Sequence, residues 1–287
     1  MSNVVLYTII TLSSIGGASA IILYFVAQKF KVYEDPRIDQ VEAALPSANC
    51  GGCGFAGCRN FAEAIVKSDS FDGLFCPVGG NETMKNIAAL LGRQAVEQEA
   101  RIAVIRCNGT PKHRPQTNHY DGAPSCAITH SLYMGESACP NGCLGNGDCV
   151  SVCTFDAIFM NPETGLPEVI DEKCTACNAC VKACPRNIIE LRKKNPKDRK
   201  IFVSCVNTEK GAIARKNCEV ACIACGKCVK VCEFDAIVVE NNLAYIDPTK
   251  CRLCRKCAPE CPTNSILEIG FPARKEKPLK TEETSAV

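Results

Sequence analysis

The chain lacks several features that mark common classes of enzyme. It has no tryptophan, and aromatic residues make up only 6% of its 287 residues. No GxxxxGKS/T loop, HExxH pair or GxSxG elbow occurs, so the usual signatures of P-loop nucleotide hydrolases, zinc proteases and serine hydrolases are missing. We therefore expect no catalytic residue and no substrate pocket in this chain.

Charge and histidine content also exclude functions. The 33 Lys and Arg residues nearly balance the 31 Asp and Glu residues, so overall charge gives no argument for nucleic-acid binding. The three histidines, His113, His119 and His130, lie in a loop-like region. A Rieske-type pair would need histidines interleaved with cysteines, so we expect these three on the surface.

Cysteine, in contrast, is abundant: 24 of the 287 residues, or about 8%. Most cysteines stand in CxxC runs, which indicate metal ligation in a reducing compartment rather than disulfides. Because few aromatic residues are available to fill a core, we expect much of the folding energy to come from bound metal.

The most regular run is CTACNACVKACP, which contains Cys174, Cys177, Cys180, Cys184 and Pro185. Bacterial ferredoxins hold 4Fe-4S clusters with this spacing: three thiolates wrap one cluster, and the fourth reaches the neighbouring one. A single run of this kind therefore predicts a partner run.

An internal repeat supplies further runs. Ser125-Cys126-x-x-Thr129 recurs as Ser204-Cys205-x-x-Thr208, and the following cysteines recur at the same offset of 79 residues. The paired positions are Cys139 and Cys218, Cys143 and Cys222, Cys149 and Cys228, and Cys153 and Cys232. In each copy a strand, a turn and a second strand lead to the next cysteine run, as in a two-cluster ferredoxin module. We predict an α+β fold with two such modules in tandem.

Three ligand sets follow if the fourth cysteine of each run ligates the other run's cluster. They are Cys222, Cys225, Cys228 and Cys261; Cys251, Cys254, Cys257 and Cys232; and Cys174, Cys177, Cys180 and Cys153. The next set is irregular, because Asn146 stands where Cys225 stands in the other copy. It retains Cys143, Cys149 and Cys184. Either Cys107 or Cys139 must supply its missing ligand.

Four cysteines remain once five clusters are assigned. They are Cys126, Cys139, Cys205 and Cys218 if Cys107 completes the irregular set, or Cys107, Cys126, Cys205 and Cys218 if Cys139 does. The four either hold a sixth cluster between the modules or are ordinary buried thiols. The sequence thus predicts at least five 4Fe-4S clusters and leaves the sixth open.

A separate group of four cysteines precedes the modules. Cys50, Cys53 and Cys58 lie in NCGGCGFAGC, and Cys76 follows in FCPVGG. The intervening glycines let the backbone approach the sulfides of a cluster. They match GxGxxG by letter, but cysteines occupy the loop and no hydrophobic strand precedes it, which argues against a dinucleotide site. Four sulfurs would also suit zinc, and this alternative stays open.

Residues 4–27 contain no charged side chain. As a helix these 24 residues would be about 36 Å long, and a bilayer core needs about 20 residues. The segment lacks the basic n-region of a signal peptide. Lys29 and Lys31 follow it, so the positive-inside rule predicts a single-pass anchor in the cytoplasmic membrane with the rest of the chain in the cytoplasm.

The chain therefore divides into an anchor (1–30), an N-terminal 4Fe-4S domain (31–100), a first ferredoxin-like module with a basic linker (101–200), a second module (201–270) and a disordered tail (271–287). Apolar spacing predicts helices over 36–45, around 61–66 and over 82–91, and a strand over 102–105. The linker RKKNPKDRK, residues 192–200, either docks an acidic electron carrier or is a solvated connection.

This order of parts resembles the B subunit of the Rnf complex, the membrane-bound ferredoxin:NAD oxidoreductase that translocates Na+ or H+. The likeness covers nearly the whole chain and rests on NCGGCGFAGC with FCPVGG, GCLGNGDCVSVC with FDAI, and the doubled module of longer, anaerobe-type members. It implies that reduced ferredoxin delivers electrons to the clusters, which relay them to membrane and flavin-bearing subunits, with NAD bound elsewhere. Cys153 and Cys232 are followed by Thr and Glu instead of Pro, which leaves the local helix geometry open.

Two other functions are compatible with the sequence. One is a polyferredoxin subunit of another membrane complex, of the hydrogenase or formate-oxidising type. The other is a non-redox cluster carrier or a zinc protein. Iron and sulfide analysis separates these classes, because five or six clusters predict about 20 to 24 iron per chain.

Overall fold

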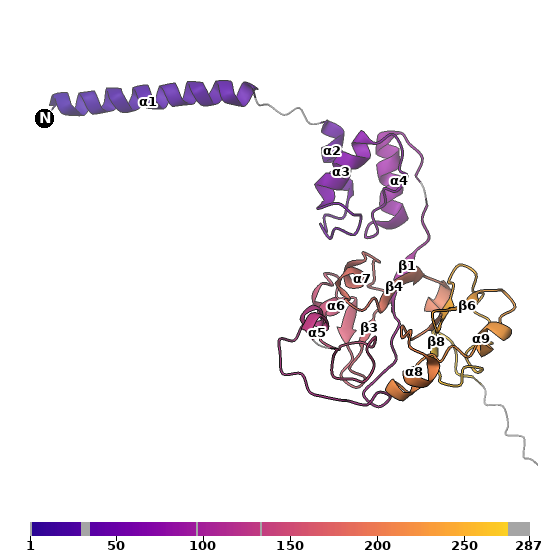
Figure 1. Cartoon of the computed structure of the whole chain (residues 1–287). Helices are drawn as coiled ribbons and strands as arrows, with labels where there is room; N and C mark the ends of the chain where they lie inside the picture. Colours follow the sequence, from indigo (N-terminus) through magenta and orange to yellow (C-terminus); the bar gives the residue numbers. More distant parts are fainter. Residues whose placement is uncertain (1, 30–34, 96, 133, 275–287) are drawn as a thin grey trace, which may run out of the picture.

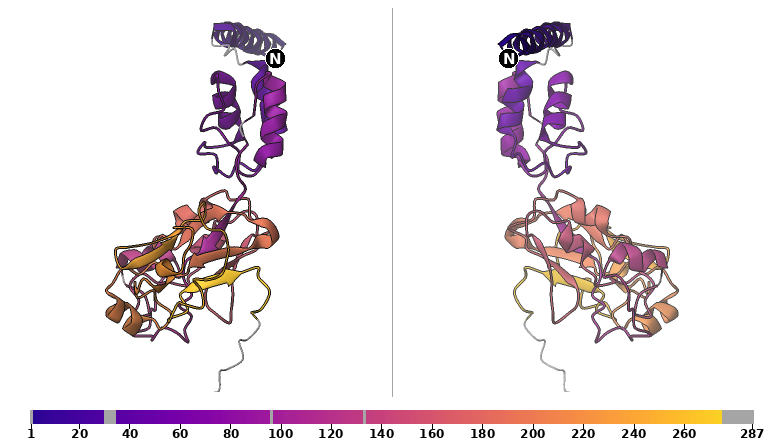
Figure 2. Two further views of the ribbon diagram at one scale, coloured as in Figure 1. Left: turned by 90° about the vertical axis from the view of Figure 1, so that its right-hand side faces the viewer. Right: turned by 90° about the vertical axis from the view of Figure 1, so that its left-hand side faces the viewer.

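The computed structural model describes residues 2–29, 35–95, 97–132 and 134–274. Along the chain follow a lone helix α1 (Ser2–Lys29), a small helical unit, and a larger part built from short strands and loops (Figure 1). In both views of Figure 2 the helical unit lies between α1 and the strand-bearing part. The predicted boundary at residues 30 and 31, and residues 275–287 of the tail predicted over 271–287, lie outside the described residues.

Helix α1 is apolar and exposes its hydrophobic side chains. The segment Val5–Lys29 has a mean hydropathy of 2.0, and its apolar stretch is not buried against the rest of the chain. The hydroxyls of Thr8, Thr11 and Ser14 donate to carbonyl oxygens about one turn back, at 2.8 to 3.0 Å, which hides these groups from apolar surroundings. By length and composition α1 can cross a membrane.

The helical unit packs α2 (Pro36–Ala44), α3 (Cys58–Lys67) and α4 (Gly80–Leu91) around one core. Asp35 caps α2 by accepting from the backbone N–H of Arg37. The side chains at the centre are at most 1% exposed and are Val41, Phe61, Ile65, Met84 and Ile87. The three predicted helices are present, and α4 begins two residues earlier than predicted.

The first module contains two antiparallel strand pairs. β1 (Arg101–Ile105) pairs with β4 (Ile189–Lys193), and β2 (Ile158–Met160) pairs with β3 (Pro167–Val169). The short helices are α5 (Cys126–Leu132), α6 (Asp148–Ser151) and α7 (Ala179–Ala183). The predicted strand at 102–105 and the predicted strand, turn and strand are therefore present.

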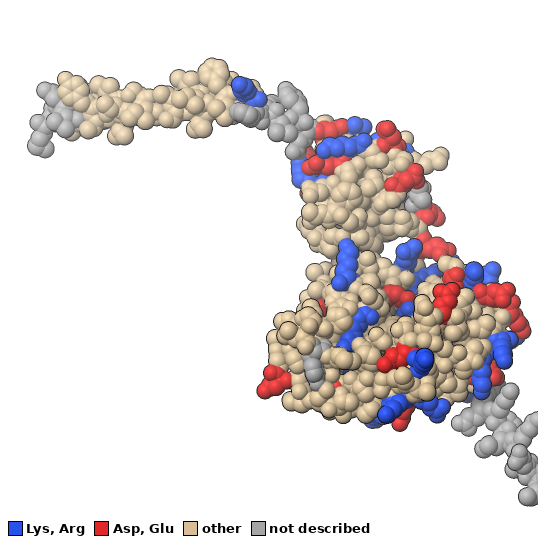
Figure 3. All heavy atoms as spheres, viewed as in Figure 1, with Lys and Arg blue, Asp and Glu red and all other residues tan. Residues whose placement is uncertain are grey.

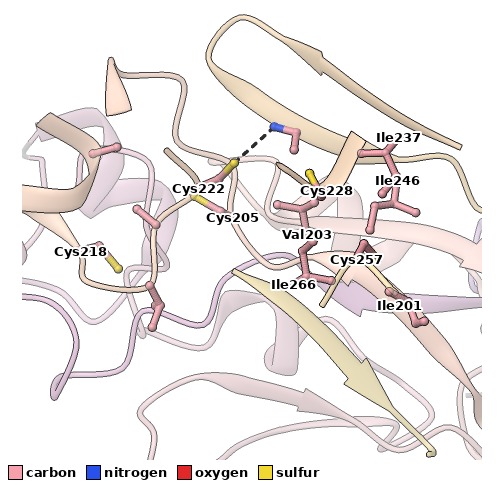
Figure 4. Packing of buried hydrophobic residues seen from close by; sticks show 14 residues of the cluster. Ile201, Val203, Cys205, Cys218, Cys222, Cys228, Ile237, Ile246, Cys257 and Ile266 are labelled. Carbon is pink, nitrogen blue, oxygen red and sulfur yellow. Dashed lines mark hydrogen bonds between the residues drawn. The ribbon is translucent and has the colours of Figure 1, made fainter. Parts of the chain in front are cut away.

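The second module repeats this arrangement. β5 (Lys200–Val203) pairs with β8 (Ile266–Ile269), and β6 (Ile237–Glu240) pairs with β7 (Leu243–Ile246). Helices α8 (Gly211–Asn217) and α9 (Lys227–Lys230) precede β6, and a 3-10 turn, η1 (Pro196–Asp198), joins β4 to β5. Its core mixes aliphatic side chains with thiols (Figure 4).

Two buried arginines of the first module bond to the backbone of the second. Arg106 donates to the carbonyl oxygens of Val203 and Cys205, both at 3.3 Å. Arg192 donates to the carbonyl oxygen of Ile246 at 2.8 Å. Because a guanidinium offers five donors, each arginine can satisfy several buried acceptors at once. These bonds hold the two modules against each other.

The basic linker, residues 192–200, is expected either to dock an acidic electron carrier or to be a solvated connection, and its two ends do neither. Arg192 is 3% exposed and Lys200 8% exposed. The Lys200 ammonium forms an ion pair of 2.5 Å with Asp171. Both ends of the segment 192–200 therefore stabilise the contact between modules, and they face neither solvent nor a docked protein.

Candidate metal centres

All 24 cysteines are free thiols, and most of them line small cavities in groups of four. In the described part of the chain, no three His, Cys, Asp or Glu side chains converge closely enough to hold a single metal ion. A 4Fe-4S cluster has its irons at alternate corners of a cube, so its thiol ligands are spread around a cavity. A single tetrahedral zinc ion needs its four ligands closer together. The donor set therefore fits 4Fe-4S clusters.

In the second module the structure brings together the thiols that the motifs group. The first set, here called the Cys225 set, lines one cavity and comprises Cys222, Cys225, Cys228 and Cys261. The second, the Cys254 set, comprises Cys232, Cys251, Cys254 and Cys257. Burial raises the pKa of Cys251, and its neighbours Cys254 and Cys232 add to the shift. Backbone N–H groups point at these thiols, as in the bond from Ser265 N–H to Cys261 Sγ at 3.2 Å.

The regular set of the first module also gathers as predicted. This Cys177 set lines a cavity and comprises Cys153, Cys174, Cys177 and Cys180. Its loop turns twice through left-handed backbone, at Ala176 (φ 55°) and Asn178 (φ 71°). The second module makes the same turns at Ala224 (φ 54°) and Gly226 (φ 70°), so the two loops share one wrapping geometry.

The irregular set gathers with a cysteine other than the two predicted. The thiols that line this cavity are Cys126, Cys143, Cys149 and Cys184. Cys107 and Cys139, the two cysteines predicted to supply the fourth thiol, line a different cavity. Cys126 begins α5, which folds back over α6 and so reaches the cavity from outside the motif.

Hydrogen bonds from α6 hold the start of α5 in place. The Asp148 carboxylate accepts from the Ser125 hydroxyl at 3.0 Å, from Cys126 N–H at 2.8 Å and from Ala127 N–H at 3.0 Å. Burial acts to raise the Asp148 pKa, but these bonds outweigh it and lower the pKa below its ordinary value. An ionised Asp148 thus caps α5 and fixes the position of Cys126.

The remaining four thiols gather between the modules. This set, here called the bridging set, lines a cavity and comprises Cys107, Cys139, Cys205 and Cys218. Asn207 is 1% exposed; its backbone N–H donates to Cys205 Sγ at 3.4 Å, and its side-chain amide to Cys139 Sγ at 3.7 Å. Gly109 lies so close that a Cβ there would be 3.3 Å from Cys218 Sγ. Both predicted leftover groups included Cys126, which lines the cavity of the irregular set instead.

The N-terminal set, which comprises Cys50, Cys53, Cys58 and Cys76, lies in the helical unit. Burial raises the pKa of Cys76, and the nearby thiols of Cys53 and Cys58 add to the shift. Cys58 N–H donates to the Asn49 side-chain oxygen at 2.8 Å, which orients the start of α3. Cys50 lies three residues before Cys53 on the same loop.

Comparison with known proteins identifies the family. The chain is 45% identical to the B subunit of the Na(+)-translocating ferredoxin:NAD(+) oxidoreductase complex of Acetobacterium woodii, over 93% of this chain and 78% of that protein. It is 40% identical to the B subunit of the ion-translocating oxidoreductase complex of Methanosarcina acetivorans, over 93% of this chain and 99% of that protein. It belongs to this family of B subunits.

A third relative and three family models agree with this membership. The B subunit of the proton-translocating ferredoxin:NAD(+) oxidoreductase complex of Clostridium ljungdahlii is 38% identical over 93% of both chains. The models are "Putative Fe-S cluster" at residues 45–70, "4Fe-4S binding domain" at 167–190 and "4Fe-4S dicluster domain" at 221–265. None of these ranges includes a thiol of the bridging set.

Burial shapes the chemistry of the thiols in this protein. It raises the pKa to about 12 for Cys143, Cys149, Cys205 and Cys257. Without iron these thiols are therefore protonated at neutral pH. Because the thiolate is the ligand, iron binding must displace their protons, which couples cluster assembly to proton release.

Proposed function

We propose that this chain relays electrons from reduced ferredoxin to membrane and flavin-bearing subunits that reduce NAD, within a complex that moves Na+ or H+ across the membrane. The names of the relatives support this: two are subunits of ferredoxin:NAD(+) oxidoreductases, one Na(+)-translocating and one proton-translocating.

The cofactor complement we propose is six 4Fe-4S clusters, one in each thiol set. The six sets use each of the 24 cysteines once. Such a cluster accepts and releases one electron, and its potential depends on charge, hydrogen bonds to sulfur and exposure. The chain itself fixes the thiolates and supplies the N–H groups that point at them.

The observation that carries the proposal is a continuous series of contacts between the sets. In the second module Cys222 of the Cys225 set lies beside Cys205 of the bridging set (Figure 4). From the bridging set the next contact is direct, because Cys143 N–H donates to Cys107 Sγ at 3.5 Å. The bridging set therefore connects the two modules.

The series continues through the first module to the helical unit. Burial raises the pKa of Cys149, and Cys180 of the Cys177 set is close enough to add to the shift. Cys177 then faces the N-terminal set, because a Cβ on Gly52 would lie 2.9 Å from the Cys177 carbonyl oxygen. The Cys254 set lies near this series at its end, where Cys257 and Cys228 share one core, and we place it as a branch.

The series ends at the unit that follows the membrane helix in the chain. We propose that α1 anchors the protein and that the cluster-bearing parts lie in the cytoplasm. The basic residues Lys29 and Lys31 directly after the apolar segment support this orientation. Protease protection in sealed, right-side-out vesicles tests it: the cluster domains should be protected, and digestion of the domains in intact vesicles would contradict the orientation.

The experiment that tests the relay compares two cysteine variants, each of which removes one cluster. Cys107→Ser removes a thiol of the bridging set, on the series, and Cys232→Ser removes a thiol of the branch. We expect Cys107→Ser to abolish ferredoxin-dependent NAD reduction by membranes, and Cys232→Ser to retain most of it. Equal activity in the two variants would refute the proposal that electrons pass through the bridging set and bypass the Cys254 set.

Metal analysis accompanies that test. Wild-type chain should contain about 24 iron and 24 sulfide, and each variant about four fewer of both. Zinc without sulfide would refute the electron-transfer function altogether.

A further inference from the structure

Two of the 24 cysteines are exposed, Cys225 and Cys254, and both lie in the second module. The other 22 are buried or half-buried. An exposed ligand marks the place where a cluster comes nearest to solvent, and a soluble redox protein must approach such a place. The second module therefore offers two candidate points of electron entry, one in the Cys225 set and one in the Cys254 set.

Unpaired basic side chains accompany the Cys225 loop. The N-terminus of α8 packs on this loop, since a Cβ on Gly211 would lie 2.5 Å from the carbonyl oxygen of Ile223. Helix α9 begins two residues after Cys225. The exposed basic residues on or next to these helices are Lys210, Arg215, Lys216, Lys227 and Lys230. None of the five forms an ion pair with an acid that the structure describes. Figure 3 shows basic side chains along the lower edge of the molecule, where Figure 1 places α8.

Two of the basic residues next to Cys254 are engaged in ion pairs instead. Arg255 forms an ion pair of 2.8 Å with Glu268. Lys256 pairs with Glu233. Their charges are neutralised locally, whereas Lys250 and Arg252 are exposed and form no ion pair with an acid that the structure describes. The Cys254 loop thus presents two unpaired basic residues, against five near the Cys225 loop.

Apolar side chains complete the surface near Cys225. Ile213 on α8 is 49% exposed and Val229 on α9 is 38% exposed. Weak electron-transfer encounters use small interfaces, and charged groups around them raise the rate of encounter more than the affinity. A small apolar area with a basic surround fits a partner that carries acidic side chains around its own redox centre.

We propose that the surface formed by α8, α9 and the Cys225 loop is the docking site for an acidic electron-carrier protein, the reduced ferredoxin of the proposed function on which this inference rests. One electron leaves the carrier, which is oxidised, and enters the site of the Cys225 set, which is reduced; no bond or proton is exchanged. Cys222 of that set lies beside the bridging set, so the electron enters the series at its end. Helices α8 and α9 also lie away from α1 (Figure 1), which leaves the surface open to the cytoplasm.

The test uses two charge-reversal variants of the full-length, cluster-loaded chain. The docking variant is Lys210→Glu/Arg215→Glu/Lys227→Glu. The matched control, Lys250→Glu/Arg252→Glu/Lys256→Glu, makes the same change of charge around the Cys254 loop. Binding of oxidised ferredoxin is measured first, because it requires no electron transfer, and stopped-flow reduction by reduced ferredoxin is measured second. Iron content and reduction by dithionite show whether each variant keeps its clusters.

At low salt we expect the docking variant to bind ferredoxin at least tenfold more slowly than wild type, and to be reduced by ferredoxin at least tenfold more slowly. The difference should shrink as salt screens the charges. The control should stay within about twofold of wild type. An unchanged docking variant, or a loss confined to the control, would overturn the proposal. If wild-type chain neither binds ferredoxin nor accepts its electrons, the proposed function fails instead, so the two failures are distinguishable.

Discussion

The side-chain amide of Asn146 donates a hydrogen bond of 2.8 Å to the hydroxyl of Thr129. Asn146 occupies the position at which the second module has the ligand Cys225. Thr129 lies on α5, the helix that begins with Cys126. The residue that replaces a motif cysteine therefore binds the helix that supplies the substitute thiol, and the irregular motif is a different route to four thiols around one cavity.

This relationship predicts that the two routes are interchangeable. Cys126→Ser should lose one cluster, about four iron and four sulfide per chain. Adding Asn146→Cys, which restores the motif of the second module, should return the iron content to the wild-type value. Metal analysis and electron paramagnetic resonance of the reduced chain measure both. Asn146→Cys alone is the control and should keep all six clusters. Wild-type iron content in Cys126→Ser would contradict the assignment of Cys126.

Sequence spacing predicted the regular sets because three ligands of each are local and the paired motif supplies the fourth. Cys174, Cys177 and Cys180 stand on one loop, and the backbone can wrap them in only a few ways. The same reasoning failed for Cys126, whose position depends on Asp148, 22 residues further along the chain. The offset of 79 residues also equates Cys126 with Cys205, although the structure assigns them to different sets. Cys126 and Cys205 lie in different sets because a long connection between β1 and α5 precedes Cys126. No local sequence pattern predicts the path of this connection.

The contact between the modules depends on Arg192. Its guanidinium donates to Ile246 O and Ile201 O, pairs with Glu190 and lies 5.2 Å from the centre of the Tyr245 ring. Arg192→Met leaves these acceptors unpaired, so we expect the loaded chain to lose about 3 kcal/mol of unfolding free energy. This corresponds to a melting temperature lower by about 6 to 12 °C.

Arg215→Met is the matched control for that substitution. Arg215 is exposed and forms no ion pair with an acid in the described part of the chain, so the change should cost no more than about 0.5 kcal/mol. Thermal melting followed at the cluster absorbance measures both variants. Equal melting temperatures for the two would show that Arg192 does not hold the modules together.

Removal of iron should affect the parts of the chain unequally. The core of the first module is small: it contains Ala103, Ile158, Ile189 and the thiol Cys149. The helical unit has its own core of larger side chains, such as Phe61. After chelation under reducing conditions, we expect rapid hydrogen exchange in β2 and β3 and slower exchange in α3 and α4. Persistent protection of β2 and β3 in iron-free chain would show that the first module folds without its clusters.

Gly52 controls the last contact of the series, between the helical unit and the first module. A Cβ at this position would lie 2.9 Å from the Cys177 carbonyl oxygen and 3.0 Å from Pro77 Cγ. Because the first of these neighbours is backbone, Gly52→Ala must push the Cys177 loop away, and Gly52→Val must push it further. We expect iron content to stay constant while magnetic coupling between the two adjacent reduced clusters weakens from Ala to Val.

Gly54 provides the comparison for Gly52. A Cβ on Gly54 would meet nothing within 4 Å, although its φ of 90° makes any side chain strained. Gly54→Ala should therefore disturb the N-terminal site itself and leave its contact with Cys177 in place. Full magnetic coupling in Gly52→Val would show that Gly52 does not control this contact. If the coupling were lost and ferredoxin-dependent NAD reduction stayed at the wild-type rate, electrons would have to leave the first module by a route other than the Gly52 contact.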